Sequence, residues 1–180
     1  MTWAIFSDSH IKAIGEMLTS GSERVLAVVG GALLEDTIYR TLSERLRDIP
    51  DIVESILGVD GPLGNTGPQI EVLFLLYGID QKTRVALKAV AHIRNFFAHD
   101  LDASFDSVDK EFVKAINQLN LHDGKTHYPH HLGGGDSPHK IETINNRRDL
   151  FTVNLKLGLI ALMRDRVSHE PHSSEQRKTP

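Results

Sequence analysis

Residues 84–102, RVALKAVAHIRNFFAHDLD, have the spacing of one long amphipathic helix. At about 100° per residue, its apolar side chains fall on one stripe and its basic and imidazole side chains on the opposite one. The apolar stripe consists of Ala86, Val90, Ile93 and Phe97. The polar stripe consists of Arg84, Lys88, His92, Asn95 and His99. Arg94 lies at the flank of the apolar stripe, about 140° from His99. The stretch therefore predicts a helix that packs on one side and carries candidate functional side chains on the other.

The rest of the chain also has helical spacing, and no segment shows the alternation of a strand. Ser22 and Asp80 are the expected N-caps of two helices, Pro50 ends the first of these, and Gly78 is an expected C-cap. Residues 58–69 are rich in glycine and proline and predict turns, without the pattern of a phosphate-binding loop. Besides the central stretch, the expected helices cover residues 7–20, 22–48, 52–57, 69–77, 108–121 and 143–168.

The length of 180 residues and the hydrophobic fraction of 40% predict a single all-α domain over residues 1–168, a bundle of about five to seven helices. Its core would comprise residues 22–121 and a C-terminal helix over 143–168. Residues 122–142 are expected to be a flexible loop, and the polar residues 169–180 a disordered tail. The loop holds His122, His127, His130, His131 and His139. Their spacing matches no zinc signature, so we expect neither a metal nor a cofactor.

The overall charge and the absence of cysteine narrow the class of function. Lys and Arg number 20 against 24 Asp and Glu, so nucleic-acid binding would require a local basic patch. No helix-turn-helix with an exposed basic second helix is visible, which disfavours direct reading of DNA. The lack of cysteine excludes disulfides and thiolate metal sites. Without a signal-peptide pattern or an apolar run of about 20 residues, the expected location is the cytoplasm, with no membrane association.

Two features of the helix expected over residues 22–48 bear on the central stretch. Gly30 and Gly31 mark either a weak point or the close approach of another helix. Glu35 and Asp36 follow in the same helix. Either they belong to a solvated face, or one of them meets Arg94 or His99 across a helix pair, holding the guanidinium or orienting the imidazole.

The sequence Arg94-Asn95-Phe96-Phe97-Ala98-His99 resembles the signature of the HEPN superfamily, in which an Arg is followed a few residues later by a His. Residues 22–101 are also similar to the mannitol operon repressor family. The similarity rests on the Glu35-Asp36 pair, the Gly61-Pro62-Leu63-Gly64 turn, the short apolar helix that follows it, and Ile93-Arg94-Asn95-Phe96-Phe97-Ala98-His99.

The resemblance implies a HEPN-like helical fold and two different activities. Many HEPN proteins are metal-independent endoribonucleases with a cleft shared between two protomers. In that case Arg94 would stabilise charge on the scissile phosphate, and His99 would transfer a proton at the 2′-hydroxyl. Asn95 would position these groups, and Glu35 or Asp36 would be the accessory polar group. Arg84, Lys88 and His92 would then be candidate nucleic-acid contacts. The repressor family instead implies a regulator of sugar-operon transcription, which in this acidic chain would act through a protein partner.

Three hypotheses remain open from the sequence. The first is a regulatory interaction module, and the second is a dimeric ribonuclease that binds RNA. In the third, Arg94 only anchors the central helix to Glu35 or Asp36, and His99 hydrogen-bonds a neighbouring helix end. A homodimer is expected, because a site split between Arg94 and His99 would need a second protomer to complete it. Whether the protein is an enzyme is left undecided by these residues.

Overall fold

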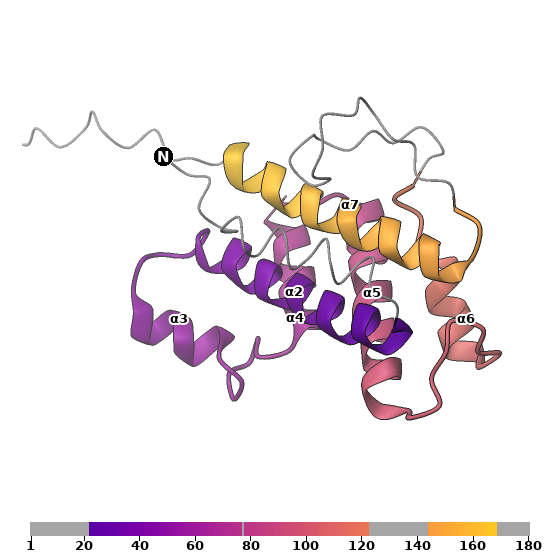
Figure 1. Cartoon of the computed structure of the whole chain (residues 1–180). Helices are drawn as coiled ribbons and strands as arrows, with labels where there is room; N and C mark the ends of the chain where they lie inside the picture. The colour runs from indigo at the N-terminus through magenta and orange to yellow at the C-terminus, as the bar shows by residue number, and fades with distance from the viewer. Residues whose placement is uncertain (1–21, 77, 123–143, 169–180) are drawn as a thin grey trace, which may run out of the picture.

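The computed structural model describes residues 22–76, 78–122 and 144–168, and this part of the chain consists of α-helices and connecting turns without a strand (Figure 1). The helices are α2 (Glu23–Ser43), α3 (Pro50–Leu57), α4 (Thr66–Leu75), α5 (Gln81–His99), α6 (Lys110–Asn117) and α7 (Arg147–Ser168). The expected all-α bundle of five to seven helices is thereby confirmed. The helix expected over 7–20, the tail 169–180 and nearly all of the loop 122–142 lie outside the described residues.

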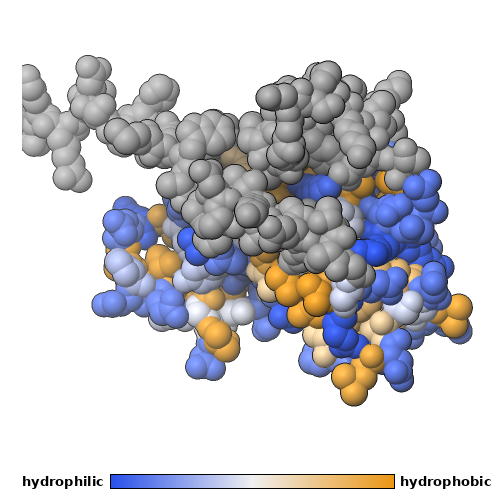
Figure 2. Space-filling view, in the orientation of Figure 1, coloured by the Kyte–Doolittle hydropathy of each residue, from blue (hydrophilic) through white to orange (hydrophobic). Residues whose placement is uncertain are grey.

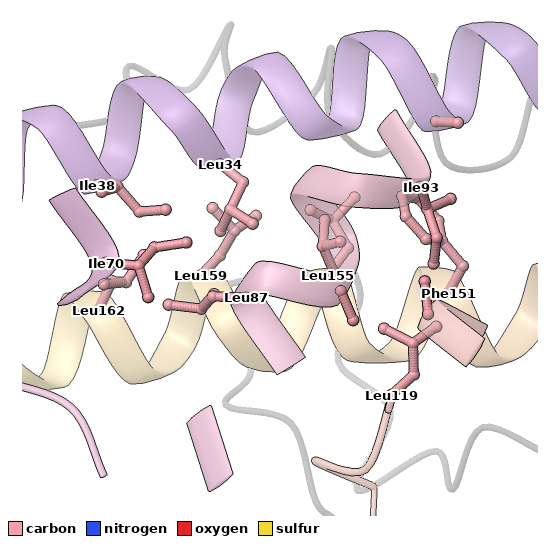
Figure 3. Close-up of a cluster of buried hydrophobic side chains, with 14 of the residues drawn as sticks. Leu34, Ile38, Ile70, Leu87, Ile93, Leu119, Phe151, Leu155, Leu159 and Leu162 are labelled. Atoms are coloured by element: carbon pink, nitrogen blue, oxygen red, sulfur yellow. The ribbon is translucent and has the colours of Figure 1, made fainter. Parts of the chain in front are cut away.

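The core lies where α2, α5 and α7 meet. Figure 1 shows α2 and α7 side by side with α5 crossing behind them, and both contact α5. Figure 3 shows side chains from α2 and α7 pointing toward each other, with residues of α4 and α5 between them. The fully or almost fully buried residues of this layer include Leu34, Ile38, Ile70, Leu87, Ile93, Leu155, Leu159 and Leu162. The apolar stripe expected on the central helix is buried as well.

A cluster of aromatic rings fills the core at the C-terminal end of α5. Phe97 lies 4.8 Å from Phe105 and 6.2 Å from Phe112 between ring centroids, and Phe105 lies 5.4 Å from Phe151. These are the separations at which tilted and edge-to-face ring pairs are favourable. The four rings come from α5, the connection after it, α6 and α7, so the cluster joins these elements.

Side-chain caps set several helix ends as the sequence predicts. Ser22 Oγ accepts a hydrogen bond from the Val25 N–H at 3.4 Å, and Asp80 Oδ1 accepts one from the Thr83 N–H at 2.7 Å. The hydrogen bond from Thr83 lowers the pKa of Asp80. Both residues therefore act as the expected N-caps of α2 and α5.

Several expected boundaries are wrong by a few residues. The helix expected over 22–48 ends at Ser43, because the chain tightens there into i→i+3 turns from Arg45 to Leu42 and from Leu46 to Ser43. The next helix, α3, begins at Pro50 and not at residue 52. Pro50 therefore both follows α2 and occupies the first position of α3.

The two helices beside the candidate site differ from expectation for local reasons. α4 begins at Thr66 rather than at residue 69, because the first helical turn accommodates Pro68 without a backbone N–H. It ends at Leu75, and Gly78 lies two residues after the C-cap, where its N–H donates to the Leu73 carbonyl at 2.9 Å. α5 ends at His99 rather than at residue 102, because Asp100 has an extended backbone.

The last two described helices begin later than expected because their N-caps lie further along the chain, and α6 also ends at Asn117 rather than at residue 121, where the chain tightens into i→i+3 turns at Gln118 and Leu119. Asp109 accepts a hydrogen bond from the Phe112 N–H, so α6 begins after it and not at residue 108. Asn146 Oδ1 accepts one from the Asp149 N–H at 2.8 Å, so α7 begins at Arg147 and not at residue 143. Arg147 donates to the carbonyls of Phe105 and Ser107, which compensates its position at a helix N-terminus.

On the face shown in Figure 2, hydrophobic residues reach the surface in separate small groups between hydrophilic ones. None of the helices in the described ranges has both the length and the apolar character that crossing a membrane requires.

Candidate functional site

A cleft of about 410 Å³ lies between α2, the first turn of α4 and the polar stripe of α5. We refer to it as the α4–α5 cleft. It is lined by Glu35, Gly64, Asn65, Thr66, Gly67, Lys88, Ala91, His92, Arg94 and Asn95. Arg94, Asn95 and Glu35 of the predicted catalytic set and Lys88 and His92 of the predicted nucleic-acid contacts are thus brought together. His99, Asp36 and Arg84 are not part of the lining.

Arg94 enters the cleft across the closest approach of α2 and α5. A Cβ built on Gly31 would lie 2.5 Å from Arg94 Cβ, a separation that real Cβ atoms essentially never show. Gly31 is therefore buried beneath the stem of Arg94, and of the two readings of the Gly30–Gly31 pair, close helix approach is the observed one.

The guanidinium of Arg94 is held by two neighbours within the same protomer. Its Nη2 lies 3.4 Å from Glu35 Oε2, and its Nη1 donates to Asn95 Oδ1 at 2.9 Å. The side chains of Arg94 and Glu35 are 29% and 27% exposed. Nε of Arg94 is buried and has no hydrogen-bond partner among the residues that the structure describes.

Asp36 does not join this group. Its Oδ2 accepts a hydrogen bond from Arg40 Nε at 2.7 Å, one turn further along α2, and both side chains are about half exposed. Of the two adjacent carboxylates, only Glu35 contacts Arg94, because successive residues of a helix point about 100° apart.

His99 is the last residue of α5, and its side chain is exposed. The helix end beside it is held by Arg24, which donates from Nη1 to the Phe97 carbonyl and from Nη2 to the Asp100 carbonyl, the latter at 2.5 Å. A cation at this position satisfies carbonyls that a helix end leaves unpaired and complements the helix dipole. Within one protomer, Arg94 and His99 therefore do not line the same cleft.

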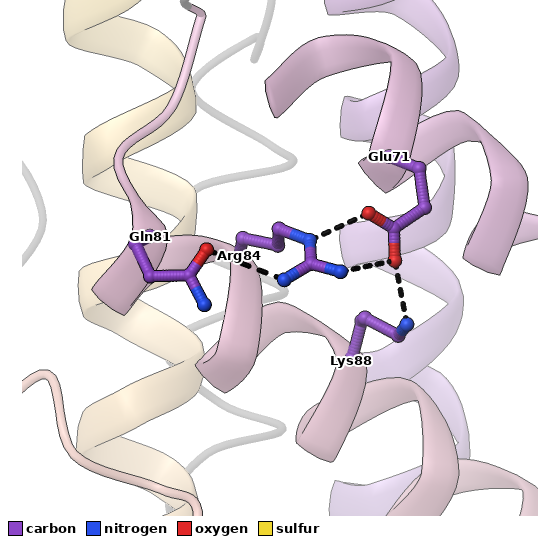
Figure 4. A network of polar contacts seen from close by, with 4 residues as sticks. All are labelled: Glu71, Gln81, Arg84 and Lys88. Atoms are coloured by element: carbon purple, nitrogen blue, oxygen red, sulfur yellow. Dashed lines mark hydrogen bonds and ion pairs between the residues drawn. The ribbon is translucent and has the colours of Figure 1, made fainter. Parts of the chain in front are cut away.

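Arg84 and Lys88, two of the predicted nucleic-acid contacts, both bind Glu71 of α4 (Figure 4). Arg84 donates from Nε and Nη2 to the two carboxylate oxygens at 2.5 and 2.8 Å, and Lys88 Nζ donates to Oε1 at 2.6 Å. The hydrogen bonds from Arg84 and then from Lys88 lower the pKa of Glu71 to about 2. The guanidinium of Arg84 also lies 5.2 Å from the Phe74 ring centroid, within the range of a cation–π contact.

Glu71 was not among the residues that the sequence singled out. It pairs with residues 13 and 17 positions away, and no spacing rule within one helix relates them. The one available signal is that Glu71 is the only charged residue of α4, a helix otherwise composed of apolar and uncharged polar residues.

His92 and Asn95 complete the α5 side of the cleft. Both are exposed, as their place on the polar stripe predicts. Asn95 is occupied by Arg94, whereas His92 has no hydrogen-bond or ion-pair partner among the described residues. The cleft therefore offers an imidazole, an amide group and two basic side chains beside the start of α4.

No metal site within the described residues and no similar protein indicates a function for this cleft. No group of three or more metal-ligating side chains occurs within the described ranges, and the histidines from His127 to His139 lie outside them. The two basic side chains that line the cleft, Lys88 and Arg94, are each paired with a carboxylate, Glu71 and Glu35. No protein-family model, no curated protein and no solved structure matches this chain.

Proposed function

We propose that this protein is a regulatory interaction module of the mannitol operon repressor type, which acts through a protein partner rather than by cleaving RNA or reading DNA directly. The observation that carries the proposal is that Arg94 is already bound to residues of its own protomer. Its stem covers Gly31, and its guanidinium binds Glu35 and Asn95. A catalytic Arg would instead have to face a phosphate together with His99.

The charge distribution on α5 also supports a role other than nucleic-acid binding. Arg84 and Lys88 share the carboxylate of Glu71, and Arg94 is paired with Glu35. Extended contact with a phosphate backbone would require these basic groups to leave their partners. The net charge of −4 provides no general attraction for a polyanion.

The ribonuclease hypothesis is the second candidate because of one specific observation. His99 is exposed and has no partner among the described residues, so it is free to act on a substrate held by a second protomer. In such a dimer, His99 of one protomer and Arg94 of the other would line a shared cleft, and proton transfer by the imidazole would need no metal.

An RNA cleavage assay in EDTA separates these functions. Purified wild-type protein, His99→Ala and the surface control Arg40→Ala would be incubated with single-stranded RNA. The proposal expects no cleavage by any of the three proteins. Cleavage by wild type and Arg40→Ala but not by His99→Ala would overturn it in favour of the ribonuclease.

A binding experiment provides the positive test. A protein recovered with the tagged full-length chain would be purified and mixed with wild type and His99→Ala, and complex formation would be measured by calorimetry. The proposal expects equal affinity for both, because His99 has no role in an interaction module. If no purified candidate forms a complex, and the protein alone binds operator DNA specifically, the proposed partner mechanism is wrong.

A further inference from the structure

We propose that the groove between α2 and α3 is the docking site for a basic segment of a partner protein, one that carries aliphatic side chains as well as Lys or Arg. The groove has a volume of about 600 Å³, and its lining residues fall between Tyr39 and Glu54. We refer to it as the α2–α3 groove. The inference rests on the proposed function, because it names the surface and the chemistry through which an interaction module would hold its partner.

The lining of the groove is apolar inside and charged at its rim. The inner residues are Tyr39 of α2, Leu46 of the turn after it, and Val53 of α3. They are half-buried and pack against the hydrophobic core. The charged residues of the lining are all exposed. A ligand can therefore bury aliphatic side chains at the centre of the groove while its charged groups stay at the solvated edge.

The rim carries an excess of negative charge. It holds four carboxylates, Glu44, Asp48, Asp51 and Glu54, against the single guanidinium of Arg47. The side chains of Asp48 and Asp51 have no hydrogen-bond or ion-pair partner among the described residues. Cationic groups of a ligand can pair with these two carboxylates without breaking an existing contact. The charge of the rim is thus complementary to a basic partner.

A hydrogen bond between side chains holds the two walls of the groove together. Tyr39 Oη of α2 donates to Glu54 Oε2 of α3 at 3.1 Å. The phenol is a neutral donor, so the bond leaves the negative charge of Glu54 in place. Because the bond fixes α3 against α2, the groove is formed before a ligand arrives, which lowers the ordering cost of binding.

The distribution of the carboxylates favours a polypeptide over a single ion. In the described part of the chain, no three acidic or imidazole side chains converge in a geometry that could hold a metal ion. The four carboxylates of the rim therefore suit positive charges that are separated from one another, as those of successive Lys or Arg side chains are. A polyamine also has separated charges, but it has no side chains to fill the apolar centre, and Arg47 would repel it.

The test is an NMR titration of the full-length, isotope-labelled chain with a synthetic peptide of leucine and lysine, whose leucines have helical spacing. A second peptide has glutamate in place of every lysine. We expect the lysine peptide to give saturable shifts of the Leu46 and Val53 amide signals, and the glutamate peptide to give none. Saturable shifts with both peptides, or with neither, would overturn the proposal.

Variants of the rim and of the lining test charge and apolar contact separately. The double variant Asp48→Asn/Asp51→Asn should weaken binding of the lysine peptide about fivefold, because each exposed ion pair contributes little. Val53→Thr replaces a methyl group of the lining by a hydroxyl. It should weaken binding about fourfold, the loss that corresponds to burial of one such group. An unchanged affinity in both variants would place the peptide elsewhere and contradict the proposal.

The double variant Asp102→Asn/Asp106→Asn is the matched control. Both carboxylates are exposed and lie in the connection between α5 and α6, which Figure 1 shows on the opposite side of the molecule from α3. We expect the affinity for the lysine peptide to stay within about twofold of the wild type, since distant exposed charges are screened. Equal weakening by the two double variants would indicate general attraction of cations to the acidic chain and would overturn the proposal.

Two further measurements address other occupants of the groove. Spermidine that binds more tightly than the lysine peptide would contradict the inference in favour of a small cation. Shifts of the Leu46 and Val53 signals on dilution of the chain alone would contradict it in favour of a second copy of this chain.

Failure of this inference and failure of the proposed function can be told apart. A purified partner that binds the wild type and Asp48→Asn/Asp51→Asn with equal affinity would overturn the role of the groove and leave the proposed function intact. Cleavage of RNA in EDTA that depends on His99 would overturn the proposed function whatever the peptide titration shows.

Discussion

Arg94 connects α5 to α2 through its stem and through its charge, and the two contributions can be separated experimentally. Glu35→Gln removes the negative partner, and Arg94→Met keeps most of the stem that covers Gly31. In a double-mutant cycle measured by urea unfolding, we expect a coupling free energy of about 0.5–1 kcal/mol, because both groups are partly exposed. A coupling of zero would mean that the pair does not contribute to the free energy of unfolding.

Glu71 is expected to make the stability of the protein depend on pH in acid. Its pKa is about 2 in the folded chain and 4.5 in the unfolded reference, so its contribution is present above pH 4.5 and is lost as the pH falls toward 2. Glu71→Gln should therefore destabilise the protein at neutral pH and make much less difference near pH 3. The measurement is the difference in urea unfolding midpoint between variant and wild type at several pH values. A difference that does not change with pH would contradict the prediction.

For single residues, the sequence predicts which side chains share one face of a helix better than it predicts which side chains meet between helices. The polar stripe of α5 follows from periodicity alone, and the Arg94–Glu35 pair was one of the alternatives that the sequence raised. The bond between Arg84 and Glu71 could not be predicted, because it depends on how α4 and α5 cross. The exposed position of His99 follows from the stripe, but its separation from the cleft depends on which part of α5 faces α2 and the start of α4.

Two glycines in neighbouring helices should respond to alanine in opposite ways. Gly67 has open space at its Cβ position, so Gly67→Ala should raise the free energy of unfolding by about 0.5–1 kcal/mol through lower entropy of the unfolded chain. Gly31→Ala forces α2 away from the stem of Arg94, and overpacking of about 1–3 kcal/mol outweighs the gain in helix propensity. Thermal unfolding of both variants checks the signs. A stabilising Gly31→Ala would show that the two helices separate easily.

A helix boundary can be predicted where a neighbouring residue sets it, and it is missed where a distant residue sets it. Ser22 and Asp80 were recognised because a cap is a short-range signal. The end of α5 lies at His99 and not at residue 102, and it is held by Arg24, 73 positions before the Phe97 carbonyl that it binds. A polar residue near a helix end is a weak signal until its partner is known.

The aromatic cluster should control the stability of the whole molecule. Phe97 is completely buried beside the rings of Phe112 in α6 and Phe105 in the connection between α5 and α6, and Phe105 in turn contacts Phe151 of α7. Phe97→Ala is expected to cost about 3–5 kcal/mol, a large part of the about 5–15 kcal/mol that stabilises a typical domain. Urea unfolding followed by circular dichroism measures the loss. Ala98→Gly, at an exposed neighbouring position, is the control and should cost about 1 kcal/mol.

The fold class follows from the sequence because apolar side chains recur with helical spacing most clearly in α3, α5 and α6, and no segment alternates as a strand would. The packing order does not follow from it. Nothing in the spacing of Leu34 or Leu159 indicates that the first and last described helices share one layer of the core. That information lies in complementary shapes of side chains far apart in the chain.

The pairing of α2 with α7 has a consequence for the newly made chain. A ribosome releases residues from the N-terminus onward, so α2 and α5 leave it before α7 is complete. During that interval Leu34, Ile38 and Leu87 lack the side chains of α7 that cover them in Figure 3. A nascent chain that pauses before residue 162 therefore exposes a leucine-rich surface of the kind that chaperones bind. Docking of α7 onto α2 and α5 would end that exposure.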